Sequence, residues 1–235
     1  MSHEDERIKA SALDWARRNK KAFARRLTNL DKYPGETNPV SVFMAGSPGA
    51  GKTEASKALL KRLNNDFLRI DPDEFRHCCP GYTGSNSWLF QGAVSILLSK
   101  VLDYAFKQQQ SFLLDGTLSN EKTAFENVRR ALGKKRDVLI LYVYQDPYQA
   151  WRFVQAREVL EGRRIPAESF IEQLFDAREV VQKLKAEFST SVQVDVILKD
   201  LDGGDRRFAA NVSNLDAAAP LRHSRQDLRA HIDRS

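Results

Sequence analysis

Eight consecutive residues have the types and spacing of a phosphate-binding loop. They are Gly46, Ser47, Pro48, Gly49, Ala50, Gly51, Lys52 and Thr53, and they match the pattern G-x-x-x-x-G-K-[ST]. Glycines permit backbone conformations that a Cβ atom forbids, so several N–H groups can turn toward phosphate oxygens. Lys52 then supplies charge to the β- and γ-phosphates, and the Thr53 hydroxyl a ligand for Mg²⁺. With the adjoining Glu54, this segment predicts a site for ATP and Mg²⁺.

Polar residues follow three apolar runs of the chain at the point where each run ends. Ligands of an open α/β sheet bind outside the carboxyl ends of its strands, so we expect these polar residues to border one site. The three segments are Asp71-Pro-Asp73-Glu-Phe-Arg76, Asp115-Gly-Thr117 and Gln145-Asp146-Pro147.

Phosphoryl transfer to an alcohol needs a carboxylate that orients the hydroxyl and accepts its proton. We favour Asp73 for this role. Asp71 lies closer to the preceding apolar run and next to Pro72, so it could instead cap the following turn or bind a magnesium-bound water. Asp71, Arg76 and Tyr82 are assigned to the substrate side of the site.

Asp115 ends a predicted buried strand, as the carboxylate of a Walker B motif would. It could orient Mg²⁺ or a substrate hydroxyl, and Thr117 adds a second polar group at the same edge. The alternative is a turn residue before Gly116. Asp146 differs, because Pro147 at the first helical position indicates a simple helix cap.

Arginines are concentrated at the end of one predicted helix and in the loop that follows. A planar guanidinium in such a place can bridge phosphate oxygens when a lid closes over the γ-phosphate. Arg157 and Arg163 are therefore predicted catalytic cations, and Arg164 a nucleotide contact. The alternative is that they are surface arginines paired with Glu158 and Glu161.

The elements that must position these residues are predicted from short apolar runs that alternate with amphipathic segments. Such runs, separated by helices, indicate an α/β fold of the P-loop NTPase, kinase-like type. We expect a parallel sheet of about five strands with helices on both faces. The predicted strands are 40–45, 67–70, 111–114, 138–144 and 194–198.

Three segments of the chain are distinguished by composition. Residues 1–39 form a predicted N-terminal helical extension, 40–213 the kinase domain, and 214–235 a polar tail that we expect to be loosely held. Apolar residues on the first helix predict a packed face opposite a solvated basic one. They are Ile8, Ala12, Trp15, Ala22, Phe23, Leu27 and Leu30.

Charge and cysteine content bound the class of protein. The net charge of +6 is compatible with a nucleic acid, a phosphorylated substrate or an acidic partner, but no aromatic residues interleave with the basic residues of the first helix. Nucleic acid is therefore the less favoured ligand. No apolar stretch approaches the ~20 residues of a membrane span, and the adjacent Cys78 and Cys79 agree with a reducing compartment. We expect a cytoplasmic protein without a membrane partner.

The pattern resembles the zeta toxin group of P-loop kinases, which phosphorylate UDP-N-acetylglucosamine and related UDP-sugars. The resemblance depends on the loop 46–53, on Ile70-Asp-Pro-Asp-Glu-Phe-Arg76, on Leu114-Asp-Gly-Thr117 and on the arginines before Ile165-Pro166. It implies that Asp73 is the catalytic aspartate, that Arg157 and Arg163 are lid arginines, and that an antitoxin could cover the nucleotide site. Asp115 stands where relatives often carry glutamate.

The leading hypothesis is an ATP- and Mg²⁺-dependent kinase that phosphorylates a hydroxyl of a nucleotide sugar. A polynucleotide or small-molecule kinase, such as an antibiotic phosphotransferase, shares the loop and the aspartate and stays open. A non-catalytic, nucleotide-dependent switch is the alternative from another class. It is less favoured, because no glutamate follows Asp115 to activate water.

Overall fold

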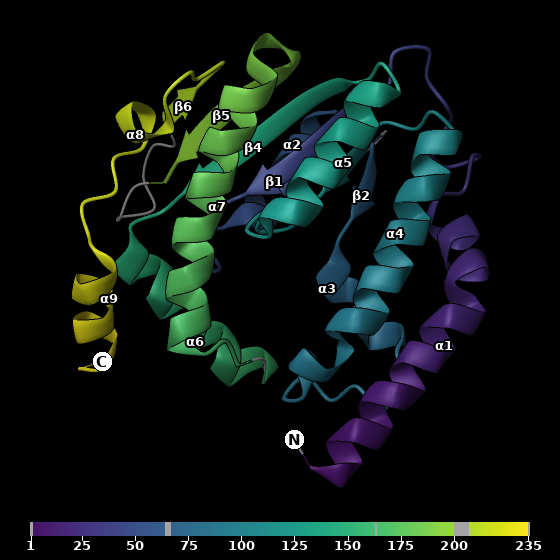
Figure 1. The fold of residues 1–235 in the computed structure, drawn as a ribbon, viewed down its shortest axis with the longest axis horizontal. Coiled ribbons are helices and arrows are strands. Elements are labelled where there is room, and N and C mark those ends of the chain that lie inside the picture. The colour runs from purple at the N-terminus through teal and green to yellow at the C-terminus, as the bar shows by residue number, and fades with distance from the viewer. Residues whose placement is uncertain (1, 64–66, 163, 200–206, 235) are drawn as a thin grey trace.

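A six-stranded sheet forms the centre of the protein (Figure 1). The computed structural model describes residues 2–63, 67–162, 164–199 and 207–234. Five strands are parallel and the edge strand β6 is antiparallel, in the order β2-β3-β1-β4-β5-β6. The strands are β1 (Val40–Ala45), β2 (Leu68–Ile70), β3 (Phe112–Leu114), β4 (Asp137–Tyr144), β5 (Val192–Leu198) and β6 (Arg207–Ala209).

The predicted α/β architecture is confirmed, and each predicted strand is present to within two residues at its ends. β6 was not predicted, because a three-residue strand at a sheet edge leaves almost no periodic signal. The central strands are apolar on both faces because helices cover both faces. On β1, Phe43 and Ala45 contribute to one hydrophobic cluster, whereas Val42 and Met44 contribute to the other.

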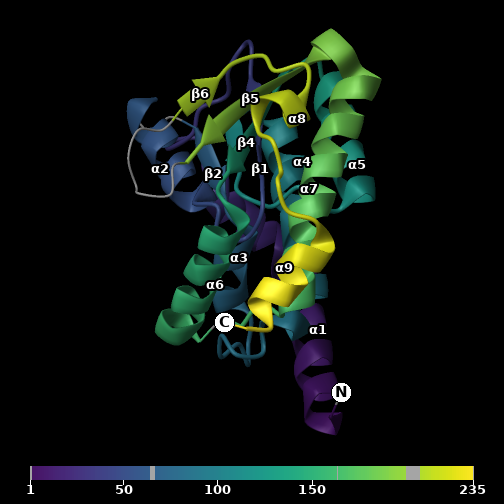
Figure 2. The same cartoon turned by 90° about the vertical axis from the view of Figure 1, so that its left-hand side faces the viewer.

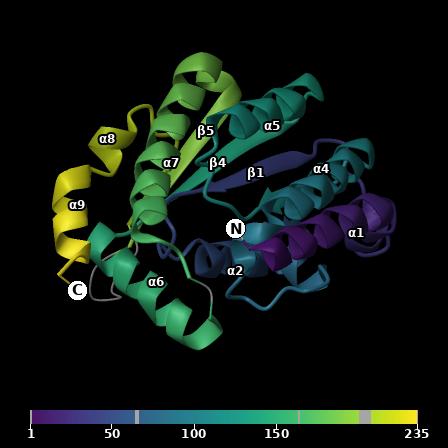
Figure 3. The same cartoon turned by 60° about the horizontal axis from the view of Figure 1, so that its bottom comes forward.

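Helices cover the two faces unequally (Figure 3). Four long helices enclose the larger hydrophobic cluster on one face, and α2 packs on the other. The helices of the first face are α1 (His3–Leu27), α4 (Gln91–Lys107), α5 (Glu121–Gly133) and α7 (Ala167–Phe188), and α2 spans Lys52–Arg62. The short α3 (Pro72–Phe75) and the longer α6 (Pro147–Glu161) lie at the carboxyl ends of the strands (Figure 1).

The N-terminal helix α1 belongs to the main core. A capping box starts it, in which the Asp5 amide donates to the Ser2 hydroxyl at 3.1 Å and the Ser2 amide to the Asp5 carboxylate at 2.9 Å. Ala12 and Ala16 are fully buried, so α1 and α4 lie close along their length (Figure 1). The basic face is solvated as predicted, but Ala22 and Leu30 are exposed, which corrects their assignment to the packed face.

One helical stretch in the described part of the chain, Ser87–Lys107, is long and apolar enough to cross a membrane, which corrects the expectation that no apolar stretch approaches that length. About half of it is buried inside the protein, where α4 packs between α1 and the sheet. Its apolar composition is accounted for by this core position.

The C-terminal segment is docked on the domain, which corrects the expectation of a loosely held tail. It forms α8 (Leu215–Ala218) and α9 (Arg225–Ile232), and α9 lies against α6 and α7 (Figure 2). Leu228 is fully buried and Ile232 nearly so. Their spacing of four residues puts both on one face of α9, and this apolar stripe within a charged sequence is the signal that was overlooked.

We predict that Leu228→Ala destabilises the protein by about 2 to 5 kcal/mol, because it leaves a cavity among the side chains of α6, α7 and α9. Thermal denaturation should show a Tm lower by roughly 5 °C or more. Gln226→Ala, on the exposed side of α9, is the matched control and should leave Tm unchanged. Equal Tm values for the two variants would mean that the C-terminal segment does not contribute to the fold.

Candidate active site

The loop between β1 (Val40–Ala45) and α2 (Lys52–Arg62) has the backbone conformation of a phosphate-binding loop. Gly46, Gly49 and Gly51 have φ of 128°, 73° and 82°, in the region that side chains disfavour. The Lys52 ammonium donates to the carbonyl oxygens of Gly46 at 3.0 Å and Ser47 at 2.6 Å. The Gly46 amide donates to the Thr117 carbonyl at 3.2 Å, which ties the loop to the segment after β3. Backbone amides and the first turn of α2 thus face the place where phosphate would bind.

A cavity of about 830 Å³ opens at this end of the sheet. It brings together most of the predicted site residues, from the loop, from the ends of β2 and β3, and from α6. Those on its lining are Pro48, Gly49, Gly51, Lys52, Thr53, Glu54, Asp71, Asp73, Arg76, Asp115, Thr117 and Arg157.

Six predicted residues are not among the described residues of the lining or lie outside the described chain. Tyr82 is not among the described residues of the lining, and its ring packs edge-on against His77 and Phe90. Arg164 is largely exposed, with its Nε 3.9 Å from the Glu158 carboxylate, the surface pairing considered as its alternative. Arg163 lies outside the described residues. Gly46, Ser47 and Ala50 are buried in the loop and are not among the described residues of the lining.

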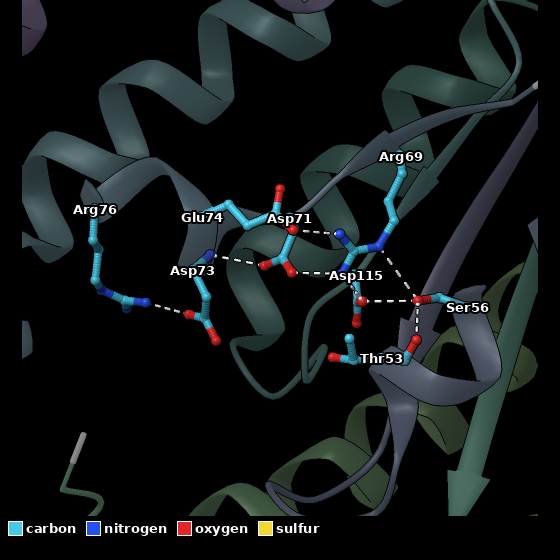
Figure 4. Close-up of polar contacts among 8 residues, drawn as sticks. All are labelled: Thr53, Ser56, Arg69, Asp71, Asp73, Glu74, Arg76 and Asp115. Carbon is cyan, nitrogen blue, oxygen red and sulfur yellow. Dashed lines mark hydrogen bonds and ion pairs between the residues drawn. The ribbon is translucent and has the colours of Figure 1, made fainter. Parts of the chain in front are cut away.

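Asp71 and Asp73 share the short helix α3 but have different surroundings. Asp71 is the N-cap, and its Oδ1 accepts the Asp73 amide at 2.9 Å, with Pro72 at the first helical position. Asp73 instead turns its half-exposed carboxylate to the cavity, where it pairs with the guanidinium of Arg76 (Figure 4). Arg76 is buried and also donates to Gln91 at 3.3 Å. Both carboxylates border the cavity and are held by an arginine, but Asp73 is the more accessible, with 46% of its side chain exposed against 11% for Asp71.

Arg69, in the middle of β2, was missed by the sequence analysis, yet it joins several site residues. Its Nη2 donates to Asp71 at 2.6 Å and to Asp115 at 2.7 Å, and its Nη1 to Glu74 at 2.7 Å (Figure 4). Burial alone would lower the pKa of Arg69, but hydrogen bonds to Asp115 and Glu74 and the charges around it raise the pKa above its usual range. Burial raises the pKa of the Asp71 carboxyl, against the opposing effect of Arg69.

Asp115 has the surroundings of an oriented carboxylate rather than of a turn residue. Its side chain is 5% exposed, and its Oδ2 lies 2.9 Å from the Ser56 hydroxyl, which is also 2.9 Å from the Thr53 carbonyl oxygen. Asp115 and Thr53 border the same cavity. A carboxylate and a hydroxyl are ligands that Mg²⁺ prefers, and the described residues contain no cluster of three acidic, His or Cys side chains that could hold a metal. The residues fit a Mg²⁺ ion that takes its remaining ligands from water and nucleotide phosphates.

Neutral polar side chains line the part of the cavity beyond Asp73. Four of them are Gln91 and Ser95 from α4 and Thr123 and Asn127 from α5. Asn127 is 7% exposed, and no hydrogen bond to its side-chain amide is found within the described ranges. Sequence reasoning predicted these helices but not these positions, because one polar residue inside an amphipathic helix carries little signal.

Lys199 is a second cation at the phosphate-binding loop that the sequence analysis did not identify. It follows β5, and its amide donates to the Tyr144 carbonyl at 2.9 Å. A Cβ atom on Gly51 would lie 1.8 Å from the Lys199 ammonium, so the lysine side chain crosses directly over this glycine. Gly51 is thus required both by its φ and by the space that Lys199 occupies.

The loop, the parallel sheet and the cavity at its carboxyl end define a P-loop protein of the kinase type. The zeta toxin family model matches residues 24–212. The chain belongs to the zeta toxin family.

Solved structures agree with this fold. A chain of the PezAT chromosomal toxin–antitoxin system of Streptococcus pneumoniae matches with a TM-score of 0.63 and 15% identity, over 91% of this chain and 92% of that one. The AvrRxo1-ORF1:-ORF2 complex with ATP gives a TM-score of 0.58 and 18% identity, over 90% and 68% of the two chains. The Pnkp1/Rnl/Hen1 RNA repair complex gives 0.51 and 13%, over 76% and 50%. A comparison with curated protein sequences gives no match.

We predict that Gly51→Ala weakens ATP binding by at least about 10-fold, because alanine in a left-handed conformation costs about 1 to 2 kcal/mol and its methyl group displaces Lys199. Titration calorimetry with ATP and Mg²⁺ measures the change. Gly133→Ala is the matched control, since a methyl group there meets nothing within 4 Å. If both variants bind ATP like the wild type, the loop is not the nucleotide site.

Proposed function

We propose that the protein is a zeta-toxin-like kinase that transfers the γ-phosphate of ATP to a hydroxyl of a UDP-sugar such as UDP-N-acetylglucosamine. The observation that carries this proposal is the position of Asp73. Its carboxylate borders the same cavity as Lys52 and Thr53, so a base and a phosphate-binding loop face one enclosed volume. That juxtaposition is what transfer to an alcohol requires and what a simple binding module does not need.

In this proposal the phosphate-binding loop holds the triphosphate and Asp73 holds the acceptor. The acceptor hydroxyl gives its proton to the Asp73 carboxylate as its oxygen bonds to the γ-phosphorus, and the bond from that phosphorus to the oxygen of the ADP leaving group breaks. Arg76 orients the Asp73 carboxylate, and Lys52 and Arg157 supply positive charge to the phosphate oxygens. Thr53 and Asp115 would hold Mg²⁺, which neutralises charge on the β- and γ-phosphate oxygens when it is bound.

The neutral wall of the cavity supports a sugar as the acceptor. Amides and hydroxyls from α4 and α5 can both donate to and accept from sugar hydroxyls. Val94, Leu98 and Ala124 between these groups provide apolar contacts of the kind that a sugar ring or its acetyl group can use.

An antitoxin partner is also proposed, because one similar structure belongs to a toxin–antitoxin system. The exposed apolar side chains of Phe153, Val159 and Leu160 on α6 lie beside or near the cavity and offer a partner a contact surface. A toxin held by an antitoxin inside the cell would agree with the predicted cytoplasmic location.

A substrate panel tests the proposal against its rivals. The purified protein is incubated with ATP and Mg²⁺ and with UDP-sugars, RNA 5′-hydroxyl ends or aminoglycoside antibiotics, and products are measured by mass spectrometry. We expect the mass of one added phosphate on a UDP-sugar. Transfer only to RNA or to an antibiotic would replace the proposed acceptor, and slow ATP loss that no acceptor accelerates would favour a nucleotide-dependent switch.

Asp73→Asn is predicted to lower kcat by on the order of 10²-fold or more, because the amide cannot accept the hydroxyl proton. ATP affinity should change little, since the side chain keeps its size and its place on α3. Asp137→Asn is the control and should leave kcat unchanged, because Asp137 is exposed at the amino end of β4, whereas the cavity lies at the carboxyl ends of the strands. If Asp73→Asn loses ATP affinity but keeps turnover at saturation, Asp73 is not the base.

A further inference from the structure

Arg69 occupies an unusual place for a charged residue. It is the middle residue of β2, and its neighbours Leu68 and Ile70 are fully buried in the main core. The strand alternation turns Arg69 to the opposite face, toward α2, where its side chain is only 14% exposed. A guanidinium so enclosed is stable only with several acceptors around it.

The acceptors of Arg69 come from the two sides of the site. On the phosphate side, its Nη2 contacts Asp115 at 2.7 Å and its Nε contacts the Ser56 hydroxyl at 3.4 Å. Ser56 in turn lies on the first turns of α2, within 2.9 Å of the Thr53 carbonyl. Arg69 is therefore tied to the residues that would hold Mg²⁺ and the phosphates.

On the acceptor side, Arg69 is tied to the helix that carries the base. Its Nη2 contacts Asp71 Oδ2 at 2.6 Å, and Asp71 Oδ1 accepts the Asp73 amide at 2.9 Å. One carboxylate thus stands between Arg69 and the backbone of Asp73 (Figure 4). The planar fork of an arginine can hold two such carboxylates at fixed directions, which the single ammonium of a lysine cannot do.

We propose that Arg69 is a positioning residue for phosphoryl transfer, which fixes the Asp115 carboxylate on the phosphate side and the Asp71–Asp73 segment on the acceptor side. The proposal rests on the proposed function, because it assigns Asp73 and Asp115 their roles in that reaction. A displacement of about 1 Å between a base and a reacting phosphate can cost on the order of 10²-fold in rate.

The charges around Arg69 also lead to an independent prediction about stability. One guanidinium faces three carboxylates, those of Asp71, Glu74 and Asp115. Without the guanidinium, Asp71 and Asp115 would be left as buried anions close together, and a divalent cation bound at Asp115 would relieve their repulsion. Loss of Arg69 should therefore make the stability of the protein depend on Mg²⁺.

The test measures kcat and thermal stability of Arg69→Gln. We expect kcat to fall by at least about 10-fold, with a KM for ATP close to that of the wild type, because the phosphate-binding loop itself is intact. In EDTA without nucleotide, Tm should fall by roughly 5 °C, and millimolar Mg²⁺ should recover most of this loss. The wild-type Tm should respond less to Mg²⁺, since the Arg69 guanidinium already pairs with both buried carboxylates, Asp71 and Asp115.

Two control variants separate positioning from general stability. Arg136→Gln removes a buried arginine whose acceptors are neutral, namely the Ser41 hydroxyl and the carbonyls of Val40 and Gln110. It should lose Tm without recovery by Mg²⁺ and keep its kcat. Glu74→Gln removes the most exposed of the three carboxylates and should change both quantities little.

The outcomes are decisive in either direction. A wild-type kcat in Arg69→Gln, or a Tm loss that Mg²⁺ does not recover, overturns the proposal. If Arg69→Gln does not fold, Arg69→Lys takes its place, and it should show the same two effects at reduced size. If the wild type phosphorylates no UDP-sugar, the proposed function fails, whereas the Mg²⁺-dependent Tm still tests whether Arg69 holds Asp71 and Asp115.

Discussion

The structure of the site is governed by electrostatic repulsion. The carboxylates of Asp71, Asp73 and Asp115 border the cavity that would also receive a triphosphate, and like charges in one partly buried site repel strongly. Each carboxylate is accordingly held by an arginine: Arg76 pairs with Asp73, and Arg69 with the other two. Lys52 and the amino end of α2 supply the positive charge that bound phosphates would need. The two arginines lie on either side of α3, so the helix that carries the proposed base is held at both ends.

The order of the strands brings these charged segments together at one cavity. β1 delivers the phosphate-binding loop, β3 beside it delivers Asp115, and the edge strand β2 delivers Asp71 and Asp73. Parallel pairing puts all three carboxyl ends at one edge, so the charged segments meet without long loops.

The N-terminal helix α1 packs against α4, which lines the cavity with Gln91, Val94, Ser95 and Leu98. Gly92 of α4 lies so near Leu13 that a Cβ atom there would be 2.9 Å from a methyl carbon of the leucine. The N-terminal helix thus supports the site although it contributes no residue to the cavity lining within the described chain.

The sequence allowed the sheet, the phosphate-binding loop and the order of the acidic segments to be predicted, because each depends on local pattern. Val40–Ala45 is an apolar run before a glycine motif, and Asp71-Pro-Asp73 follows a short apolar run. Arg69 could not be predicted in the same way. One of its main partners, Asp115, is 46 residues further along the chain, and only the pairing of β2 with β3 brings them together. Lys199 was missed for the same reason, and Asn127 because a single polar residue in an amphipathic helix carries little signal. Leu228 was missed because it lies in a segment of mostly polar and charged residues.

The two walls of the cavity differ in how they are held, and this difference bears on where the site can adapt to a ligand. The wall with α3 and α4 is backed by α1 and belongs to the main hydrophobic cluster. The opposite wall, α6, is anchored at its start, where Asp146 caps it and Ala150 and Val154 pack against α7 and α9. Its end exposes Val159 and Leu160 and stops at Gly162 in a left-handed conformation. Local opening requires least free energy where apolar contacts are fewest. We therefore expect a ligand that needs room to be accommodated by the end of α6, which carries Arg157 on the cavity lining, while the Asp73 side keeps its geometry.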